Sequence, residues 1–159
     1  MLKSSKITKS LNGEVTIPGD KSISHRSIII PSISNGKTEI SNLLMSEDVN
    51  NTINAFKEMG VSIERNGNNI VINGRGLKSL KKPDKPIYLG NSGTSARLLT
   101  GLLSAQNFNS ILTGDKSLSS RPMKRIINPL KNMGAEIKSS DGMLPMQISG
   151  KKLRNYNHE

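Results

Sequence analysis

The stretch LGNSGTSAR, from Leu89 to Arg97, is the part of the sequence from which the fold can be worked out. It holds two glycines three residues apart, hydroxyl side chains around them and then an apolar run, so we expect a loop that leads into the N-terminus of a helix. Glycine lets the backbone approach a ligand closely, and the N–H groups of a first helical turn favour an anion. Arg97 could add a two-pronged contact to phosphate or carboxylate. The alternative is that the loop only caps a helix, as many glycine-serine loops do.

A second stretch, GDKSISHR from Gly19 to Arg26, is similar to the first and indicates an internal repeat. Gly19 matches Gly90 and Arg26 matches Arg97, each at an offset of 71 residues, and the tetrapeptide KEMG recurs as KNMG at an offset of 74. The repeat predicts two copies of a βαβαββ unit. Alternating strands and helices of this kind predict an α/β fold in which helices cover one face of a sheet.

Apolar spacing and capping residues predict the elements of each repeat. In the first repeat these are a strand at 14–17, a helix capped by Ser22 or Ser24 and followed by Pro31, a strand at 37–43, a helix capped by Ser46 and ended by Gly60, and strands at 61–65 and 69–73 that turn at Asn66-Gly67-Asn68. In the second they are a strand ending at Tyr88, a helix opened by the glycine loop, a strand at 109–113, a helix that starts at Pro122, kinks at Pro129 and stops at Gly134, and strands at 135–138 and 146–149. Gly74 matches Gly150 at an offset of 76.

The composition limits the classes of protein to which the chain can belong. Its 159 residues allow one ordinary domain or part of a larger protein. The sequence contains no cysteine and only two histidines, His25 and His158, so we expect neither disulfides nor a metal centre. No apolar run approaches the roughly 20 residues that span a bilayer, and residues 1–10 lack the apolar core of a signal peptide, so we expect a cytoplasmic protein.

The net charge of +11 indicates anionic partners, which could be nucleic acid, a membrane surface or phosphorylated metabolites. Aromatic residues make up only 3% of the chain and leave few platforms on which bases could stack. The Lys-, Asn- and Ile-rich composition could also be a general bias. The repeat is more specific, because two equivalent helix N-termini carry basic and hydroxyl groups. Pseudo-symmetry could bring them together into one pocket for a ligand with more than one negative group.

Three long motifs carry a specific resemblance. PGDKSISHR, LGNSGTSARLL and LTGDKSLSSRPMKRIINPLKNMGA, in this order and spacing, resemble the N-terminal part of the 5-enolpyruvylshikimate-3-phosphate synthases, also called 3-phosphoshikimate 1-carboxyvinyltransferases, from Glu14 to about Gly150. Proteins of this family have two domains built from six βαβαββ units, so the resemblance implies that the chain holds two of the six. The expected divisions are an N-terminal strand at 1–18 that packs with the second domain, one unit at 19–80, another at 81–150, and the start of a third at 151–159.

The resemblance also implies an activity. The family transfers the enolpyruvyl group of phosphoenolpyruvate to the 5-hydroxyl of shikimate 3-phosphate through a tetrahedral intermediate, releases phosphate, and uses no metal or organic cofactor. Such chemistry needs cations around two phosphates and a carboxylate, with acid and base groups to move protons. The family's general base and further basic ligands belong to segments that follow this sequence, so we expect a fragment that binds anions weakly and does not turn over. We also expect no nucleic acid or membrane partner, and a monomer when complete.

The first repeat supplies the residues that the resemblance assigns to shikimate 3-phosphate. Lys21 is the expected catalytic group, lying between the two substrates and contacting both. Ser22 and Arg26 are expected to bind shikimate 3-phosphate. Asp48 matches an acidic position near the family's site and is expected to support it, although it could instead be an ordinary charge favoured at a helix N-terminus.

The second repeat supplies the residues that the resemblance assigns to phosphoenolpyruvate. Asn91, Gly93 and Thr94 are expected to form the loop against this substrate, and Arg121 to bind its phosphate or carboxylate. Arg97 is expected to have a supporting role. The glycine at position 93 implies room that the herbicide glyphosate occupies in the family.

Two other functions remain open from the sequence. An enolpyruvyl transferase that acts on a nucleotide sugar would share the fold but should open with an asparagine-containing lysine motif in place of GDKSISHR. A nucleic-acid or general anion-binding module would bind DNA with a steep salt dependence. Two further features have ordinary interpretations: His25 as a polar helix residue without a catalytic role, and the segment KSLKKPDK at 78–85 as a solvated linker between the repeats.

Overall fold

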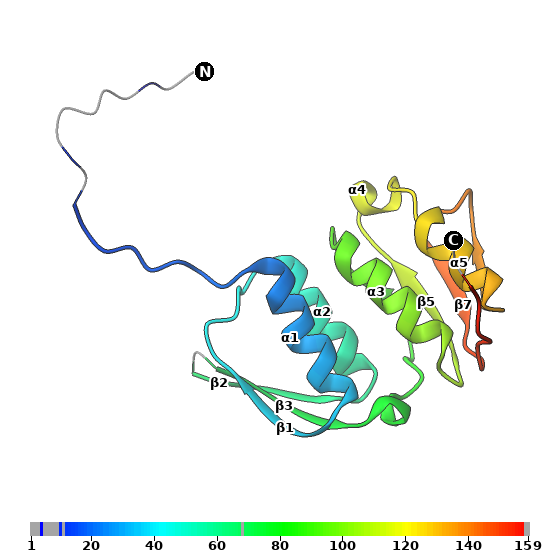
Figure 1. The fold of residues 1–159 in the computed structure, drawn as a ribbon, viewed down its shortest axis with the longest axis horizontal. Helices are drawn as coiled ribbons and strands as arrows, with labels where there is room; N and C mark the ends of the chain where they lie inside the picture. Colours follow the sequence, from blue (N-terminus) through cyan, green and yellow to red (C-terminus); the bar gives the residue numbers. More distant parts are fainter. Residues whose placement is uncertain (1–3, 5–9, 11, 68, 158–159) are drawn as a thin grey trace.

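Two groups of elements follow one another in the chain, each a sheet with helices on one face (Figure 1). The computed structural model describes residues 4, 10, 12–67 and 69–157. The first group consists of α1 (Lys21–Ile33), β1 (Asn35–Ile40), α2 (Glu47–Glu58), β2 (Ser62–Asn66), β3 (Asn69–Arg75) and the short 3-10 helix η1 (Leu77–Ser79). The second consists of β4 (Ile87–Tyr88), α3 (Gly93–Ser104), β5 (Asn109–Thr113), α4 (Lys116–Ser119), α5 (Lys124–Asn132), β6 (Glu136–Ser139) and β7 (Met146–Ser149). The α/β class expected from the repeat is confirmed.

The three strands of the first sheet have the same order as three of the four strands of the second sheet. The order in the first sheet is β1-β3-β2, with antiparallel pairs throughout. In the second sheet the order is β4-β5-β7-β6, where β4 and β5 are parallel and the other pairs antiparallel. The helix between β4 and β5 provides the crossover that a parallel pair requires. Strands β1, β3 and β2 therefore correspond to β5, β7 and β6, and within residues 12–67 the first sheet has no counterpart of β4.

The apolar spacing that predicts the helices also fills the core. On α2, Val49 and Phe56 are fully buried and face the sheet that holds the buried Ile72. On α3, Leu99 and Leu103 are fully buried in the same way, and all these residues belong to one hydrophobic cluster. Burying such a side chain contributes about 1.5–3 kcal/mol. None of the helices in the described part of the chain is long and apolar enough to cross a membrane.

The strand expected at 14–17 is not formed. This segment is extended, but Val15 is 81% exposed and Ile17 is 70% exposed, and neither lies in a ladder. Strand pairing depends on a neighbour that is distant in sequence, and local alternation of apolar residues does not supply one. Within the expected N-terminal strand at 1–18, residues 1–3, 5–9 and 11 lie outside the described residues.

The cap of α1 also differs from the expectation. Asp20 is the N-cap, and its carboxylate accepts a hydrogen bond from the N–H of Ile23 at 2.7 Å, whereas Ser22 and Ser24 lie inside the helix. Ser24 is buried, and its hydroxyl accepts a hydrogen bond from the N–H of Leu44 at 3.0 Å. The expectation of Ser22 or Ser24 is therefore wrong; Asp and Ser are about equally good caps, and residue type alone does not rank them.

Two prolines and one linker also differ from what the sequence predicts. Pro31 lies inside α1, which continues to Ile33, because a proline near the last turn removes only one backbone hydrogen bond. Pro122 precedes α5, which begins at Lys124. The short helix α4, capped by Asp115, was not expected. The linker 78–85 is only partly solvated, because η1 reaches into it and Leu80 is buried in the core.

Candidate functional site

The loop before α3 closes on the helix N-terminus as its sequence predicts. Ser92 is the N-cap, and its hydroxyl accepts a hydrogen bond from the N–H of Ser95 at 3.2 Å. Gly90 has a φ of +55°, a left-handed conformation that costs glycine little. Gly93 is the buried first residue of α3, and Thr94 beside it is exposed. The loop thus places the positive end of the α3 dipole next to an exposed hydroxyl.

Two guanidinium groups converge on Gly93. Arg97 Nη1 donates to the carbonyl oxygen of Gly93 at 3.0 Å, and Arg121 Nη2 donates to Oδ1 of Asn91. A Cβ placed on Gly93 would lie 2.7 Å from Nη1 of Arg97 and 3.3 Å from Nη1 of Arg121. The space between the two cations therefore exists because residue 93 has no side chain.

The N-terminus of α1 carries the other expected site residues. Lys21 is the first residue of the helix, and its ammonium pairs with Oδ2 of Asp48 in the first turn of α2. The side chain of Lys21 is 53% exposed, and that of Asp48 is 14% exposed. Ser22 and Arg26 are exposed, and their spacing of four residues places them on one face of α1. Asp48 is thus both a helix N-terminal charge and a partner of the expected catalytic lysine.

A buried network of polar side chains lies between the two helices. His25 Nδ1 is 2.9 Å from Oγ1 of Thr52 on α2 and 3.2 Å from Oγ of Ser95 on α3. The two hydroxyl oxygens are 2.6 Å apart, and Ser95 Oγ is 2.8 Å from Oγ of the cap residue Ser92. All four residues are buried. The network therefore joins α1 and α3, whose N-termini the sequence repeat suggested would come together, and it also includes α2.

Burial favours the neutral form of the His25 ring. Burial lowers the pKa of His25 below its ordinary value, the nearby carboxylate of Asp48 partly opposes this shift, and the ammonium of Lys21 adds to it. Nε2 of the ring is buried and has no hydrogen-bond partner among the residues that the structure describes. A second proton would therefore add a buried charge and an unpaired donor.

The structure places the expected residues in two neighbouring sets. One set lies at the start of α1, with Lys21, Ser22, Arg26 and the adjacent Asp48, and the other at the start of α3, with Asn91, Gly93, Thr94, Arg97 and Arg121. Sequence reasoning missed the buried Thr52 and Ser95. A signal for Thr52 did exist, since a polar residue next to Ile53 interrupts the otherwise apolar inner face of α2.

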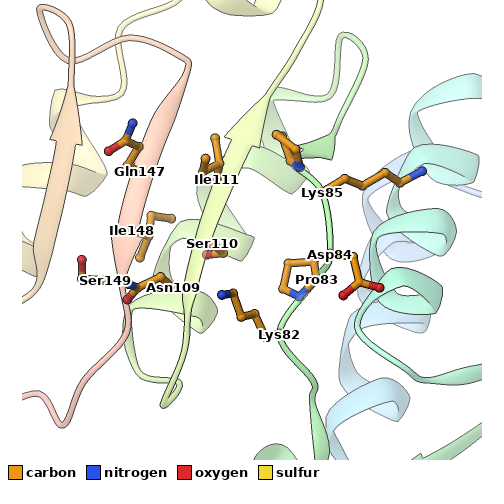
Figure 2. Close-up of a pocket in the computed structure, with 11 residues that line it drawn as sticks. Lys82, Pro83, Asp84, Lys85, Asn109, Ser110, Ile111, Gln147, Ile148 and Ser149 are labelled. Atoms are coloured by element: carbon orange, nitrogen blue, oxygen red, sulfur yellow. The ribbon is translucent and has the colours of Figure 1, made fainter.

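A separate hollow lies at the other end of β5 (Figure 2). It has a volume of about 360 Å³ and lies between the segment 82–86 and the residues Asn109, Ser110 and Ile111. Lys82 points toward β5 in this view, whereas Lys85 points toward the first group of elements, where it pairs with Glu58 at 3.1 Å. None of the expected site residues lines this hollow.

Comparison with known proteins gives a consistent result. The family model described as EPSP synthase (3-phosphoshikimate 1-carboxyvinyltransferase) matches residues 5–159. A relative from Ruthia magnifica subsp. Calyptogena magnifica, named 3-phosphoshikimate 1-carboxyvinyltransferase, is 56% identical over 153 residues, and a relative of the same name from Oceanobacillus iheyensis is 50% identical over 155. Each alignment covers 96% of this chain. A solved structure of EPSP synthase from Acinetobacter baumannii superimposes on 92% of this chain with a TM-score of 0.86 and 48% identity.

The chain spans about a third of the length of these proteins. It covers 35% of the Ruthia relative, 36% of the Oceanobacillus relative and 34% of the Acinetobacter chain. The matched regions contain both glycine stretches and both sets of expected site residues.

Proposed function

This chain belongs to the EPSP synthase family, and on that premise we propose that its two neighbouring helix N-termini bind the substrates of enolpyruvyl transfer. The loop at α3, with Arg121, takes phosphoenolpyruvate, and the start of α1 takes shikimate 3-phosphate. The observation that carries the proposal is the convergence of two guanidinium groups on the side-chain-free position of Gly93. A phosphate or carboxylate fits between such groups because bidentate arginine contacts match its geometry.

The charges in the site support distinct roles for its residues. Arg97 is already occupied by the Gly93 carbonyl, so it orients the loop, whereas Arg121 can exchange its contact with Asn91 for an anion. Lys21 lies at the edge of the α1 set, where its ammonium can stabilise negative charge that develops on a substrate oxygen. Asp48 holds this ammonium in place through their ion pair. Asn91 and Thr94 supply polar atoms at the exposed rim.

Turnover requires more than these residues. In the reaction the 5-hydroxyl of shikimate 3-phosphate loses its proton as its oxygen bonds to C2 of phosphoenolpyruvate, and the opened double bond takes a proton at C3. Loss of phosphate and of a C3 proton then restores the double bond. These transfers need a general base, and the acidic residue that the resemblance places near the site, Asp48, is paired with Lys21. We therefore propose that residues 1–159 bind the substrates but do not turn them over. The expectations of a cytoplasmic, monomeric complete protein with no nucleic acid partner stay predictions.

Titrations of the 159-residue chain test this function. In ¹⁵N NMR spectra, phosphoenolpyruvate should shift the amides of Gly93 and Thr94, and shikimate 3-phosphate should shift that of Ser22. Arg121→Ala should weaken phosphoenolpyruvate binding about tenfold or more, because it removes a charged hydrogen-bond donor. Arg125→Ala, which removes an exposed arginine on α5, is the matched control and should leave binding unchanged.

Three outcomes would contradict the proposal or a part of it. Equal weakening by Arg121→Ala and Arg125→Ala would indicate a general response to positive charge. Retention of duplex DNA with a steep salt dependence, without any response to the two substrates, would favour the nucleic-acid module instead. Phosphate release from the two substrates by this chain alone would disprove the claim that it does not turn over.

A further inference from the structure

The buried network beneath the two helix N-termini is not used by the function proposed above. His25 is fully buried, one turn after Lys21 on α1, and a single ring atom, Nδ1, lies within hydrogen-bond distance of α2 and α3. A histidine with only a packing role would not need to reach hydroxyls on two other helices. This placement makes the ring the common contact of three helices.

Both ends of the network reach groups of the proposed site. At one end, Ser95 contacts Ser92, the residue that caps α3 and immediately precedes Gly93. At the other end, the hydroxyl of Thr52 donates to the backbone carbonyl of Asp48 at 3.1 Å, and the Asp48 carboxylate pairs with Lys21. A shift of the ring would therefore move the phosphoenolpyruvate loop and the lysine partner together.

The surroundings of His25 favour an uncharged link. The charged groups near the ring are Lys21 of its own helix and Asp48 of α2, while the α3 side chains that complete the network, Ser92 and Ser95, are neutral hydroxyls. Hydroxyl groups can donate or accept, so they adapt to either neutral tautomer of the imidazole. If Nε2 took a second proton, the buried N–H would find no hydrogen-bond acceptor in the described part of the chain.

We propose that neutral His25 is a positioning residue that sets the α3 loop against the N-terminus of α1 through Thr52 and Ser95. The identity of the ligand rests on the function proposed above, but the helix geometry does not. His25 touches no substrate in this role. It acts by holding Gly93 and Lys21 at the spacing that the two neighbouring ligands require, and displacements of about 1 Å in such a site can weaken function up to a hundredfold.

Two substitutions of His25 separate positioning from packing. His25→Asn keeps a polar atom close to the place of Nδ1, whereas His25→Leu fills the volume without a hydrogen bond. Thr100→Val is the matched control, because Thr100 is also buried on α3 and its hydroxyl donates only to its own helix, at Ala96 O, 2.6 Å away. The full 159-residue chain is used, with phosphoenolpyruvate as the probe and urea unfolding to verify that each variant is folded.

Two readouts then decide the proposal. His25→Leu should weaken phosphoenolpyruvate binding about tenfold or more, while His25→Asn and Thr100→Val stay within about threefold of the unaltered chain. Residual dipolar couplings should show that α1 and α3 change relative orientation in His25→Leu alone. Unchanged orientation in a folded His25→Leu variant would overturn the positioning role.

The same design distinguishes failure of the two proposals. If the unaltered chain does not bind phosphoenolpyruvate, the proposed function of the site is wrong, and the orientation of α1 against α3 still decides the role of His25. If the chain binds phosphoenolpyruvate and His25→Leu binds equally well, the proposed function stands and the positioning role is disproved. If His25→Leu does not fold, His25→Asn combined with Ser95→Ala takes its place, and an unchanged helix orientation in this double variant overturns the role.

Discussion

The second repeat pairs β4 in parallel with β5, whereas in the first repeat no strand within residues 12–67 lies beside the corresponding edge of β1. The helix that follows is nevertheless well formed in both, with Asp20 capping α1 and Ser92 capping α3. In the first repeat the start of the helix is held by the loop before α2, through the contact of Ser24 with Leu44. The helix N-terminus, and with it the anion-favouring end, therefore forms without a preceding strand in the ladder.

The polar ends of the two repeats also differ. The start of α1 carries an ion pair between Lys21 and Asp48, so its cation is already partly neutralised. At the start of α3, Arg97 and the nearby Arg121 donate hydrogen bonds to neutral oxygens, so no ion pair in these contacts neutralises their positive charge. The second repeat should therefore bind a small anion more tightly than the first.

The largest effect should come from the glycines that occupy matching positions in the two repeats. A Cβ on Gly74 would lie 2.1 Å from the carbonyl oxygen of Pro31, and one on Gly150 would lie 2.5 Å from the carbonyl oxygens of Gln106 and Phe108. Because backbone atoms cannot easily move aside, Gly74→Ala and Gly150→Ala should each lower the free energy of unfolding by about 2–4 kcal/mol. Urea unfolding measures both.

Gly101→Ala is the control for these two variants. Gly101 lies inside α3, and a Cβ there meets nothing within 4 Å, so this variant should gain about 0.5–1 kcal/mol. A loss at Gly74 without a loss at Gly150 would show that the two repeats do not share this helix-to-strand packing.

The next effect concerns the site rather than the fold. Gly93→Ala should push the guanidinium groups of Arg97 and Arg121 apart and weaken phosphoenolpyruvate binding about tenfold, or about 1.4 kcal/mol. In the complete enzyme, glyphosate should lose more affinity than phosphoenolpyruvate, since the family resemblance places it in the same space. Calorimetric titration of the chain and inhibition assays of the complete enzyme are the measurements, and equal loss for the two compounds would contradict this placement.

The two aspartate caps should have smaller effects. Asp20 accepts the N–H of Ile23 at 2.7 Å, and Asp115 accepts the N–H of Leu118 at 2.6 Å. Replacing either by alanine should cost about 1 kcal/mol of unfolding free energy, because one N–H of the first turn loses its partner. A much larger loss for Asp20→Ala, again measured by urea unfolding, would mean that the cap compensates for the missing strand in the first repeat.

The smallest effect is a pH dependence of the free energy of unfolding, caused by His25 at the contact between the repeats. The pKa of His25 is lowered by burial in the folded chain, so the unfolded chain binds this proton more readily. The free energy of unfolding should therefore be highest above about pH 6.5, the pKa of His25 in the unfolded chain. It should fall as the pH drops below this value and level off below the lower pKa of His25 in the folded chain. Urea unfolding at several pH values should show this slope in the unaltered chain and not in His25→Asn. An identical slope in both would assign it to other groups.

Several elements could be predicted from the sequence because their signals are local. Ser46, the apolar spacing from Val49 to Met59, and Gly60 define α2 within a few residues, and β5 occurs at 109–113 as expected. The glycine loop that opens α3 is also as expected from the sequence, and the structure adds Ser92 as its cap. In each case the residues that determine the element lie within the element or next to it.

The remaining features depend on contacts between distant residues. Whether 14–17 forms a strand depends on a partner that the alternation of Val15 and Ile17 does not specify. The four residues of α4 are too few to show a helical period. The sequence indicates only an ordinary polar helix residue at His25. The ring contacts Thr52 and Ser95, which are 27 and 70 positions away along the chain, and no residue near His25 in the sequence predicts these contacts. The roles of the expected site residues stay predictions.

The uncovered edge of β1 has a consequence for how the chain behaves at high concentration. Along this edge, backbone N–H and C=O groups lie without a ladder partner in the described structure, and such an edge can recruit a strand of another molecule. Lys37 and Glu39 are both exposed on β1. Charged side chains on an edge must lose water when a second strand approaches, so they oppose edge-to-edge self-association. The charge pattern of this short strand thus protects the chain from aggregation at the place where its sheet is open.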